Sequence, residues 1–228
     1  MSRPTNFFAP NEWYHCYNRG IDKRVVFENG SDYQRFISLL YLANSSKTLH
    51  RSDMGHLNHH ELFTIHRGEP LVSIGAYILM PNHFHLLLYE ENGGGISTFM
   101  QKLGTAYTMY FNVKHERSGG LFTKPFRARH VSDDRYFQHV VDYIHLNSSE
   151  LFEYGQKEDQ NMSRRRLDML TQRITKLEAY PFSSLPDFNG VSRPERALLG
   201  NEIFDIYQKK TTKQMLENAL AYAESISE

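Results

Sequence analysis

Two apolar runs separated by a two-residue turn constrain the fold of this chain more than any other feature. Residues 71–80 read LVSIGAYILM and residues 83–91 read HFHLLLYEE, on either side of Pro81 and Asn82. A Pro-Asn dipeptide is typical of a tight turn, and short apolar runs bounded by turn residues are typical of buried strands. The pattern therefore predicts an antiparallel β-hairpin over residues 71–91.

Helices and strands are predicted on both sides of this hairpin. In chain order we expect a strand at 12–20, a turn and a helix at 25–46, the hairpin, a helix at 96–117, a strand within 118–131 and a helix opening at 132–134. Ser31 and Gln34 have the spacing of a capping box for the first helix. The order strand, helix, strand, strand, helix, strand is that of the split βαβ, ferredoxin-like layout. We therefore expect an α+β fold, a ferredoxin-like antiparallel sheet with helices on one face.

The length of 228 residues fits one domain with appendages better than two full domains. We assign residues 1–155 to that domain, with a polar insertion at 46–69, and residues 156–228 to a helical C-terminal extension. Five histidines fall in the insertion, namely His50, His56, His59, His60 and His66. Their spacing matches no strong metal-ligand pattern, so a loop beside the sheet fits them better than a metal site.

Composition excludes several other classes of protein. Cys16 is the only cysteine, which leaves no intramolecular disulfide and no cysteine-based zinc site. The first ten residues lack the apolar core of a secretory signal, and no apolar run approaches the length of a membrane span. We therefore expect a cytoplasmic protein with no membrane partner.

Positive charge is clustered, although 26 basic and 26 acidic residues leave no net charge. Between Gln101 and His130 the only acidic residue is Glu116, against six basic ones: Lys102, Lys114, Arg117, Lys124, Arg127 and Arg129. A nucleic-acid interface requires such local clustering rather than a net charge. A solvated basic face is an equally good explanation of the charges alone.

Two histidines stand in the second strand of the hairpin. Residues two apart on a strand point to the same face, so His83 and His85 project together while Phe84 and Leu86 point into the core. Two neutral imidazoles side by side can hold a divalent cation. Two surface histidines on the polar face of a strand remain the alternative.

The helix after the basic strand carries a tyrosine and an amide on one face. Tyr143 and Asn147 are spaced i, i+4, and an amide oxygen is a hard neutral ligand that could complete a site begun by two histidines. His139 lies one turn earlier and is a candidate base by position only. Taken alone, Tyr143 would more often be a residue at the edge of the core.

Five stretches in this order resemble the single-tyrosine transposases of the HUH endonuclease superfamily, in particular the REP-associated tyrosine transposase branch. They are WYHCYNRGIDKRVVF, YILMPNHFHLLL, GGLFTKPFRARHV, VVDYIHLNSSE and YPFSSLPDF, within residues 12–188. The chain departs from the family pattern at Ser148, where proline is usual, and at Pro125, where a glutamine-glycine pair is common. These departures concern DNA recognition and leave the proposed ligands and nucleophile in place.

The resemblance implies a metal-dependent DNA transposase that nicks and rejoins single-stranded DNA beside a hairpin. His83, His85 and Asn147 would hold Mg²⁺ or Mn²⁺, and Tyr143 would be the nucleophile that forms a 5′-phosphotyrosine intermediate. The expected DNA-binding residues are Arg127, Arg129, Lys124, Lys102 and Lys114. One tyrosine per chain would require either a homodimer or sequential use of one site. The alternatives are a catalytically inactive or domesticated hairpin-binding protein, and a metal-dependent phosphodiesterase unrelated to transposition.

Overall fold

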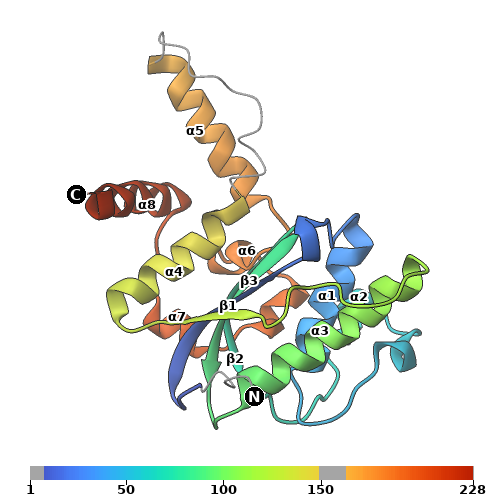
Figure 1. Ribbon diagram of the computed structural model, residues 1–228. Coiled ribbons are helices and arrows are strands. Elements are labelled where there is room, and N and C mark those ends of the chain that lie inside the picture. Colours follow the sequence, from blue (N-terminus) through green and yellow to red (C-terminus); the bar gives the residue numbers. More distant parts are fainter. Residues whose placement is uncertain (1–7, 149–162, 228) are drawn as a thin grey trace.

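The computed structural model describes residues 8–148 and 163–227 (Figure 1). Its strands are β1 (Glu12–Arg19), β2 (Ser73–Met80), β3 (His83–Glu90) and β4 (Arg127–His130). Its α-helices are α1 (Gly30–Ala43), α2 (His59–Leu62), α3 (Gly95–Lys114), α4 (Asp134–Leu146), α5 (Ser163–Glu178), α6 (Leu185–Phe188), α7 (Glu202–Ile206) and α8 (Thr212–Ser227). Short 3₁₀ turns lie at Ile21–Lys23, Arg51–Met54 and Pro194–Leu198.

The four strands form one antiparallel sheet in the order β2-β3-β1-β4. β2 and β3 are the predicted hairpin, and Met80 pairs with His83 across the turn. Every residue of β2 is buried, whereas β4 at the other edge is largely exposed. The continuous apolar run of β2 thus reflects a strand that is covered on both faces.

Helices α1 and α3 cover one face of the sheet, and α4 lies against the other (Figure 1). Phe36 of α1 lies 4.9 Å from Phe84 of β3, measured between ring centroids. On the opposite face, Phe137 of α4 lies 5.3 Å from Trp13 of β1. The α+β class and the antiparallel sheet are confirmed. The second face is partly covered by α4, because an amphipathic helix buries its apolar side there.

The helix starts follow local side-chain chemistry. Asn29 caps α1 by accepting hydrogen bonds from the N–H groups of Ser31 and Asp32, so the cap lies two residues before the predicted Ser31. Asparagine can accept both bonds with one side-chain oxygen, which makes it a strong N-cap. Asp133 caps α4 in the expected place, with its carboxylate accepting from the N–H of Tyr136.

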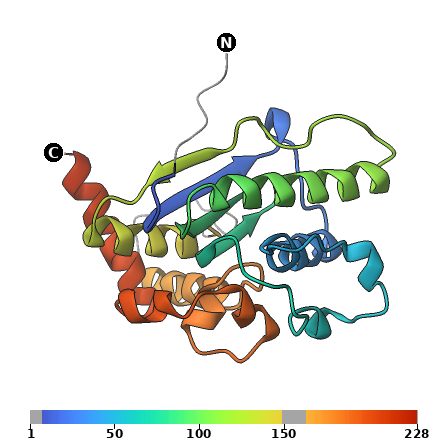
Figure 2. The ribbon, with the colours of Figure 1, turned by 90° about the horizontal axis from the view of Figure 1, so that it is seen from below.

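A segment of the C-terminal extension around Phe182 and Ser184 packs onto the sheet. The N–H of Leu79 donates to the carbonyl of Phe182 at 2.9 Å, and the N–H of Ser184 donates to that of Tyr77 at 2.9 Å, so this segment covers the free edge of β2. Residues of α6 and α7 belong to the same buried core as the strands, and Figure 2 shows these helices gathered beside α4. The predicted boundary at 155/156 lies outside the described residues.

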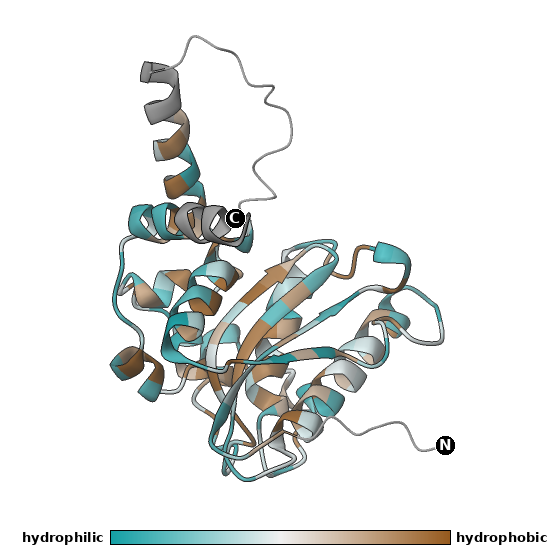
Figure 3. Ribbon diagram, turned by 60° about the vertical axis from the view of Figure 1, so that its left-hand side comes forward, coloured by the Kyte–Doolittle hydropathy of each residue, from teal (hydrophilic) through white to brown (hydrophobic). Residues whose placement is uncertain are grey.

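The insertion at 46–69 holds only the 3₁₀ turn Arg51–Met54 and the four-residue helix α2, as its polar sequence predicts. Apolar residues concentrate on the strands and on the helix faces turned toward them (Figure 3).

Within residues 8–148 and 163–227, no helix combines the length and the apolar character that crossing a bilayer requires.

Candidate active site

Strand register places the two histidines of β3 in a row of polar side chains across the sheet. On β1, Tyr17 pairs with His85 on one side and with Arg127 of β4 on the other. Directly paired residues of antiparallel strands share a face, so all three side chains project toward α4. The rings of Tyr17 and His85 are stacked, with centroids 5.4 Å apart. His83 lies two residues from His85 and extends the row.

Helix α4 holds Tyr143 over this row. The ring of Tyr143 lies 5.6 Å from that of His85 and 5.8 Å from that of His15, between centroids. Val141 and Ile144 are fully buried, while 41% of the Tyr143 surface is exposed. Burial of the apolar side of α4 therefore sets its rotation, and this rotation leaves the phenol at the rim of the site.

The other side of α4 is held by the C-terminal extension. Asp142 is buried and accepts hydrogen bonds from the hydroxyl of Tyr207 and, at 2.8 Å, from the ammonium group of Lys210. Gln138, one turn earlier, donates to the carbonyl of Ile206 at 3.1 Å. These contacts fix the position of the helix that carries Tyr143.

A cavity of about 410 Å³ lies between the sheet and α4. It is lined by Tyr17, Asn18, Arg19, His83, His85, Thr123, Arg127, Tyr143 and Asn147. The structure therefore brings together the two histidines, the tyrosine, the asparagine and one arginine that were predicted from sequence. The lining residues as a whole come from β1, β3, β4, the C-terminal half of α4 with its cap, and the loop before β4.

His83 and Asn147 meet as two hydrogen-bond acceptors. Nδ1 of His83 lies 2.6 Å from Oδ1 of Asn82, an oxygen that can only accept, so Nδ1 carries the proton. In the neutral ring Nε2 is then an acceptor, yet it faces Oδ1 of Asn147 at 3.4 Å. Neighbouring ligands of an octahedral ion with bonds of about 2.1 Å lie about 3 Å apart. The pair thus fits a cation between the two atoms.

His85 is held by His15. Nε2 of His15 lies 2.8 Å from Nδ1 of His85, and both side chains are buried. Burial, together with the positive charge that His15 and His83 can carry, lowers the pKa of His85 to about 2. Burial and Arg129 lower the pKa of His15 to about 4. Both imidazoles are therefore neutral at neutral pH, the form that ligates metals.

The predicted basic residues separate into two groups. Arg127 lines the cavity, and Lys124 and Arg129 are exposed nearby; the guanidinium of Arg129 lies 4.9 Å above the ring of Tyr136. Lys102 and Lys114 instead lie on α3, on the other face of the sheet. Lys102 donates to the carbonyls of Ser45 and Lys47 at 2.7 and 3.1 Å. Lys114 pairs with the buried Asp32 at 2.7 Å, so both lysines make structural contacts away from the cavity.

Two of the remaining histidine predictions are also placed by the structure. His139 does not line the cavity, and burial lowers its pKa. In the insertion, His59 lies 2.8 Å from the carboxylate of Glu195 and joins the insertion to the extension. Among the described residues, no group of three histidine, cysteine, aspartate or glutamate side chains could hold a metal ion. The set of His83, His85 and Asn147 contains only two such residues.

Sequence reasoning missed His15 and Tyr17. Both alternate with the buried Cys16 along β1, so a period of two was visible in the letters WYHCYNR. This alternation places two further aromatic side chains beside His85. It could have been recognised together with that of β3.

Part of the chain matches a known protein family. The model of the family described as "Transposase IS200 like" matches residues 43–147, which include His83, His85, Tyr143 and Asn147. No curated protein matches the chain. A solved structure described as "Structure of the REP associates tyrosine transposase bound to a REP hairpin" is 12% identical, covers 86% of this chain and 90% of its own, and has a TM-score of 0.49. The family match therefore covers residues 43–147, a segment that begins at the end of α1 and ends just after α4.

Proposed function

We propose that this chain is a metal-dependent tyrosine transposase that nicks single-stranded DNA beside a hairpin and transfers the cleaved strand. The observation that carries the proposal is the position of Tyr143, whose ring lies 5.6 Å from that of His85 at the cavity where His83 and Asn147 face each other. A nucleophile and a ligand set, supplied by a helix and a strand far apart in sequence, meet at one cavity. The family match supports the same chemistry.

His83, His85 and Asn147 would hold the divalent metal. When bound, the ion polarises the scissile phosphate and stabilises the negative charge that develops on its oxygens. Imidazole ligands favour Mn²⁺ by affinity, and an amide oxygen together with cellular abundance favours Mg²⁺. His15 holds the ring of His85, and Asn82 holds that of His83, as partners of metal-ligating histidines commonly do.

Tyr143 would supply the nucleophile. A free tyrosine has a pKa of about 10, so its phenol requires a nearby positive charge or a base to lose its proton. In the proposed step the phenol oxygen forms a bond to phosphorus, the bond from phosphorus to the 3′ oxygen breaks, and this oxygen takes up a proton. The DNA is left with a free 3′-hydroxyl and a 5′-phosphotyrosine link. Attack by another 3′-hydroxyl reverses the step and joins a new strand without ATP.

Arg127 and Arg129, with Lys124, would contact the DNA backbone. Register places both arginines on the face of the sheet that carries His15 and Tyr17, beside the cavity. Arginines position phosphates, and aromatic rings offer stacking surfaces for unpaired bases. Because each chain has one Tyr143, joining two DNA ends requires a homodimer or two successive uses of one site.

A covalent adduct tests the proposal. The protein is incubated with a labelled DNA hairpin carrying mixed-sequence single-stranded flanks and Mn²⁺ or Mg²⁺, and adducts are separated on a denaturing gel. We expect a metal-dependent adduct that is lost in Tyr143→Phe and kept in Tyr89→Phe, a matched change at the far end of β3. His83→Ala should also abolish cleavage.

The two other readings predict different results. A hairpin-binding protein without catalysis would retain the DNA and form no adduct with any metal. A phosphodiesterase unrelated to transposition would release cleaved DNA at the same rate in Tyr143→Phe as in the unchanged protein. Either result would refute the proposed function.

A further inference from the structure

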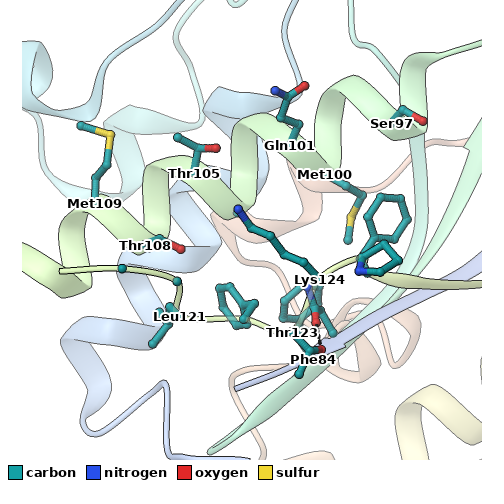
Figure 4. Close-up of a pocket in the computed structure, with 17 residues that line it drawn as sticks. Phe84, Ser97, Met100, Gln101, Thr105, Thr108, Met109, Leu121, Thr123 and Lys124 are labelled. Atoms are coloured by element: carbon teal, nitrogen blue, oxygen red, sulfur yellow. Dashed lines mark hydrogen bonds between the residues drawn. The ribbon is translucent and has the colours of Figure 1, made fainter. Parts of the chain in front are cut away.

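A second, larger cavity adjoins the first at the edge of the sheet. Its volume is about 520 Å³, and it lies between α3 and residues 119–126, which lead into β4 (Figure 4). Asn18 and Thr123 line both cavities, and the hydroxyl of Thr123 donates to Oδ1 of Asn18 at 2.8 Å. This hydrogen-bonded pair of side chains therefore borders both spaces.

The walls of this second cavity combine an apolar floor with a cation. Phe84, Leu121 and Phe122 are buried beneath it, while Met100 and Thr108 project into it from α3 (Figure 4). The side chain of Lys124 extends across it toward α3 (Figure 4). Among the described residues, none accepts a hydrogen bond from the ammonium group of Lys124. The cavity thus suits a ligand with a flat apolar body and an acidic or carbonyl oxygen.

Helix α3 leaves room for such a ligand at Gly104. A Cβ built at this position would have no atom within 4 Å, apart from the backbone of its own helix. The glycine lines the cavity one turn before Thr108. A Cβ added here would therefore enter the cavity without meeting another side chain, and a leucine would extend further into it.

We propose that this second cavity binds an unpaired nucleobase of the DNA strand whose phosphate occupies the histidine cavity. The inference rests on the proposed function, because a DNA strand that passes the shared wall of Asn18 and Thr123 reaches both spaces. The base would lie on the apolar floor, and Lys124 would contact its carbonyl oxygen or the neighbouring phosphate. Stacking against apolar and aromatic side chains suits any base, since every base has a flat face.

The test distinguishes contacts to bases from contacts to the sugar-phosphate backbone, because it changes both the DNA probe and the protein. One probe is a labelled DNA hairpin with mixed-sequence unpaired flanks, and the second has the same flanks built from abasic sugar phosphates. Three proteins are compared: a reference chain with no change on α3, Gly104→Leu, which adds bulk in the cavity, and Val113→Leu. The last change adds bulk at an exposed position of α3 outside the cavity. All three carry Tyr143→Phe, so equilibrium binding is measured by fluorescence anisotropy without cleavage.

We expect Gly104→Leu to weaken binding of the hairpin with bases about tenfold, the effect of losing one stacked base. Binding of the abasic probe should be the same in all three proteins, and Val113→Leu should match the reference chain on both probes. Leucine is a better helix former than glycine, so the melting temperature of Gly104→Leu should not fall.

Unchanged binding of the base-containing probe by Gly104→Leu would overturn the inference. An equal loss on both probes would also overturn it, because the cavity would then contact the sugar-phosphate backbone. These failures differ from a failure of the proposed function. If wild-type protein forms the Tyr143 adduct while Gly104→Leu binds normally, only the base site is wrong; if no adduct forms at all, the transposase proposal fails.

Discussion

The imidazole of His15 is hydrogen-bonded to that of His85, with Nε2 of His15 2.8 Å from Nδ1 of His85. For His85 to offer Nε2 as a ligand, its Nδ1 must donate this hydrogen bond and His15 must accept it. The same contact holds the ring in one orientation under Tyr143. His15 therefore acts on the proposed metal through His85.

Replacement of His15 by alanine should weaken metal binding about 10- to 100-fold, the usual cost of losing a partner of a metal-ligating histidine. Calorimetric titration with Mn²⁺ measures this directly. His130→Ala removes an exposed histidine from β4 and serves as the matched control. Equal Mn²⁺ affinity in His15→Ala and the control would show that His85 is not a ligand oriented by His15.

The arginines of β4 should determine the salt dependence of DNA binding. Each phosphate contact to single-stranded DNA contributes about 0.7 to the slope of log affinity against log salt. Arg127→Ala and Arg129→Ala should each weaken binding and reduce the slope by about this amount. Lys213→Ala, an exposed change on α8, should alter neither. An unchanged slope in both arginine variants would place the phosphates elsewhere.

The parts of the site that sequence could predict are those with a local period. His83 and His85 share a face because strands alternate, and Tyr143 and Asn147 share a face because helices repeat every three to four residues. Neither the strand periodicity nor the helix periodicity predicts that β3 and α4 lie against each other. That expectation came from the family resemblance, and the ring distances between His85 and Tyr143 now place the two elements together.

The basic cluster shows why charge along the sequence is a weaker guide. Lys102, Lys114 and Arg127 lie within thirty residues of one another in the sequence, yet α3 and β4 place the lysines and the arginine on opposite sides of the sheet. The structure explains the place of Lys114 through Asp32, a buried acid that needs a cationic partner. Which lysine supplies that partner depends on how α1 packs on α3, a long-range contact that no local pattern encodes.

The pair of Asp32 and Lys114 should control the acid stability of the protein. Burial opposes ionisation of Asp32, but hydrogen bonds from Lys114, Tyr110 and the N–H of Glu28 outweigh it and lower the pKa of Asp32. A group with a lowered pKa stabilises the fold above its unfolded pKa of about 3.9, and this contribution is lost as pH falls through the folded value.

Lys114→Met should therefore lower the free energy of unfolding at pH 7 by about 1–3 kcal/mol, because a buried carboxylate loses a charged partner. Its acid denaturation should also begin at higher pH than in the unchanged protein. Urea titrations across the pH range measure both effects, with Lys213→Met as the surface control. If the free energy of unfolding falls with decreasing pH in the same way in both variants, Lys114 does not stabilise the Asp32 carboxylate.

The central claim is tested most directly by the covalent adduct. The measurement identifies which residue is linked to the DNA and which end of the DNA is linked. The adduct formed with Mn²⁺ is digested with a protease and a nuclease, and the modified peptide is sequenced by mass spectrometry. The account predicts one modified residue, Tyr143, joined to a 5′ phosphate, with a free 3′-hydroxyl on the released strand. A link to any other residue, or to a 3′ phosphate, would contradict it.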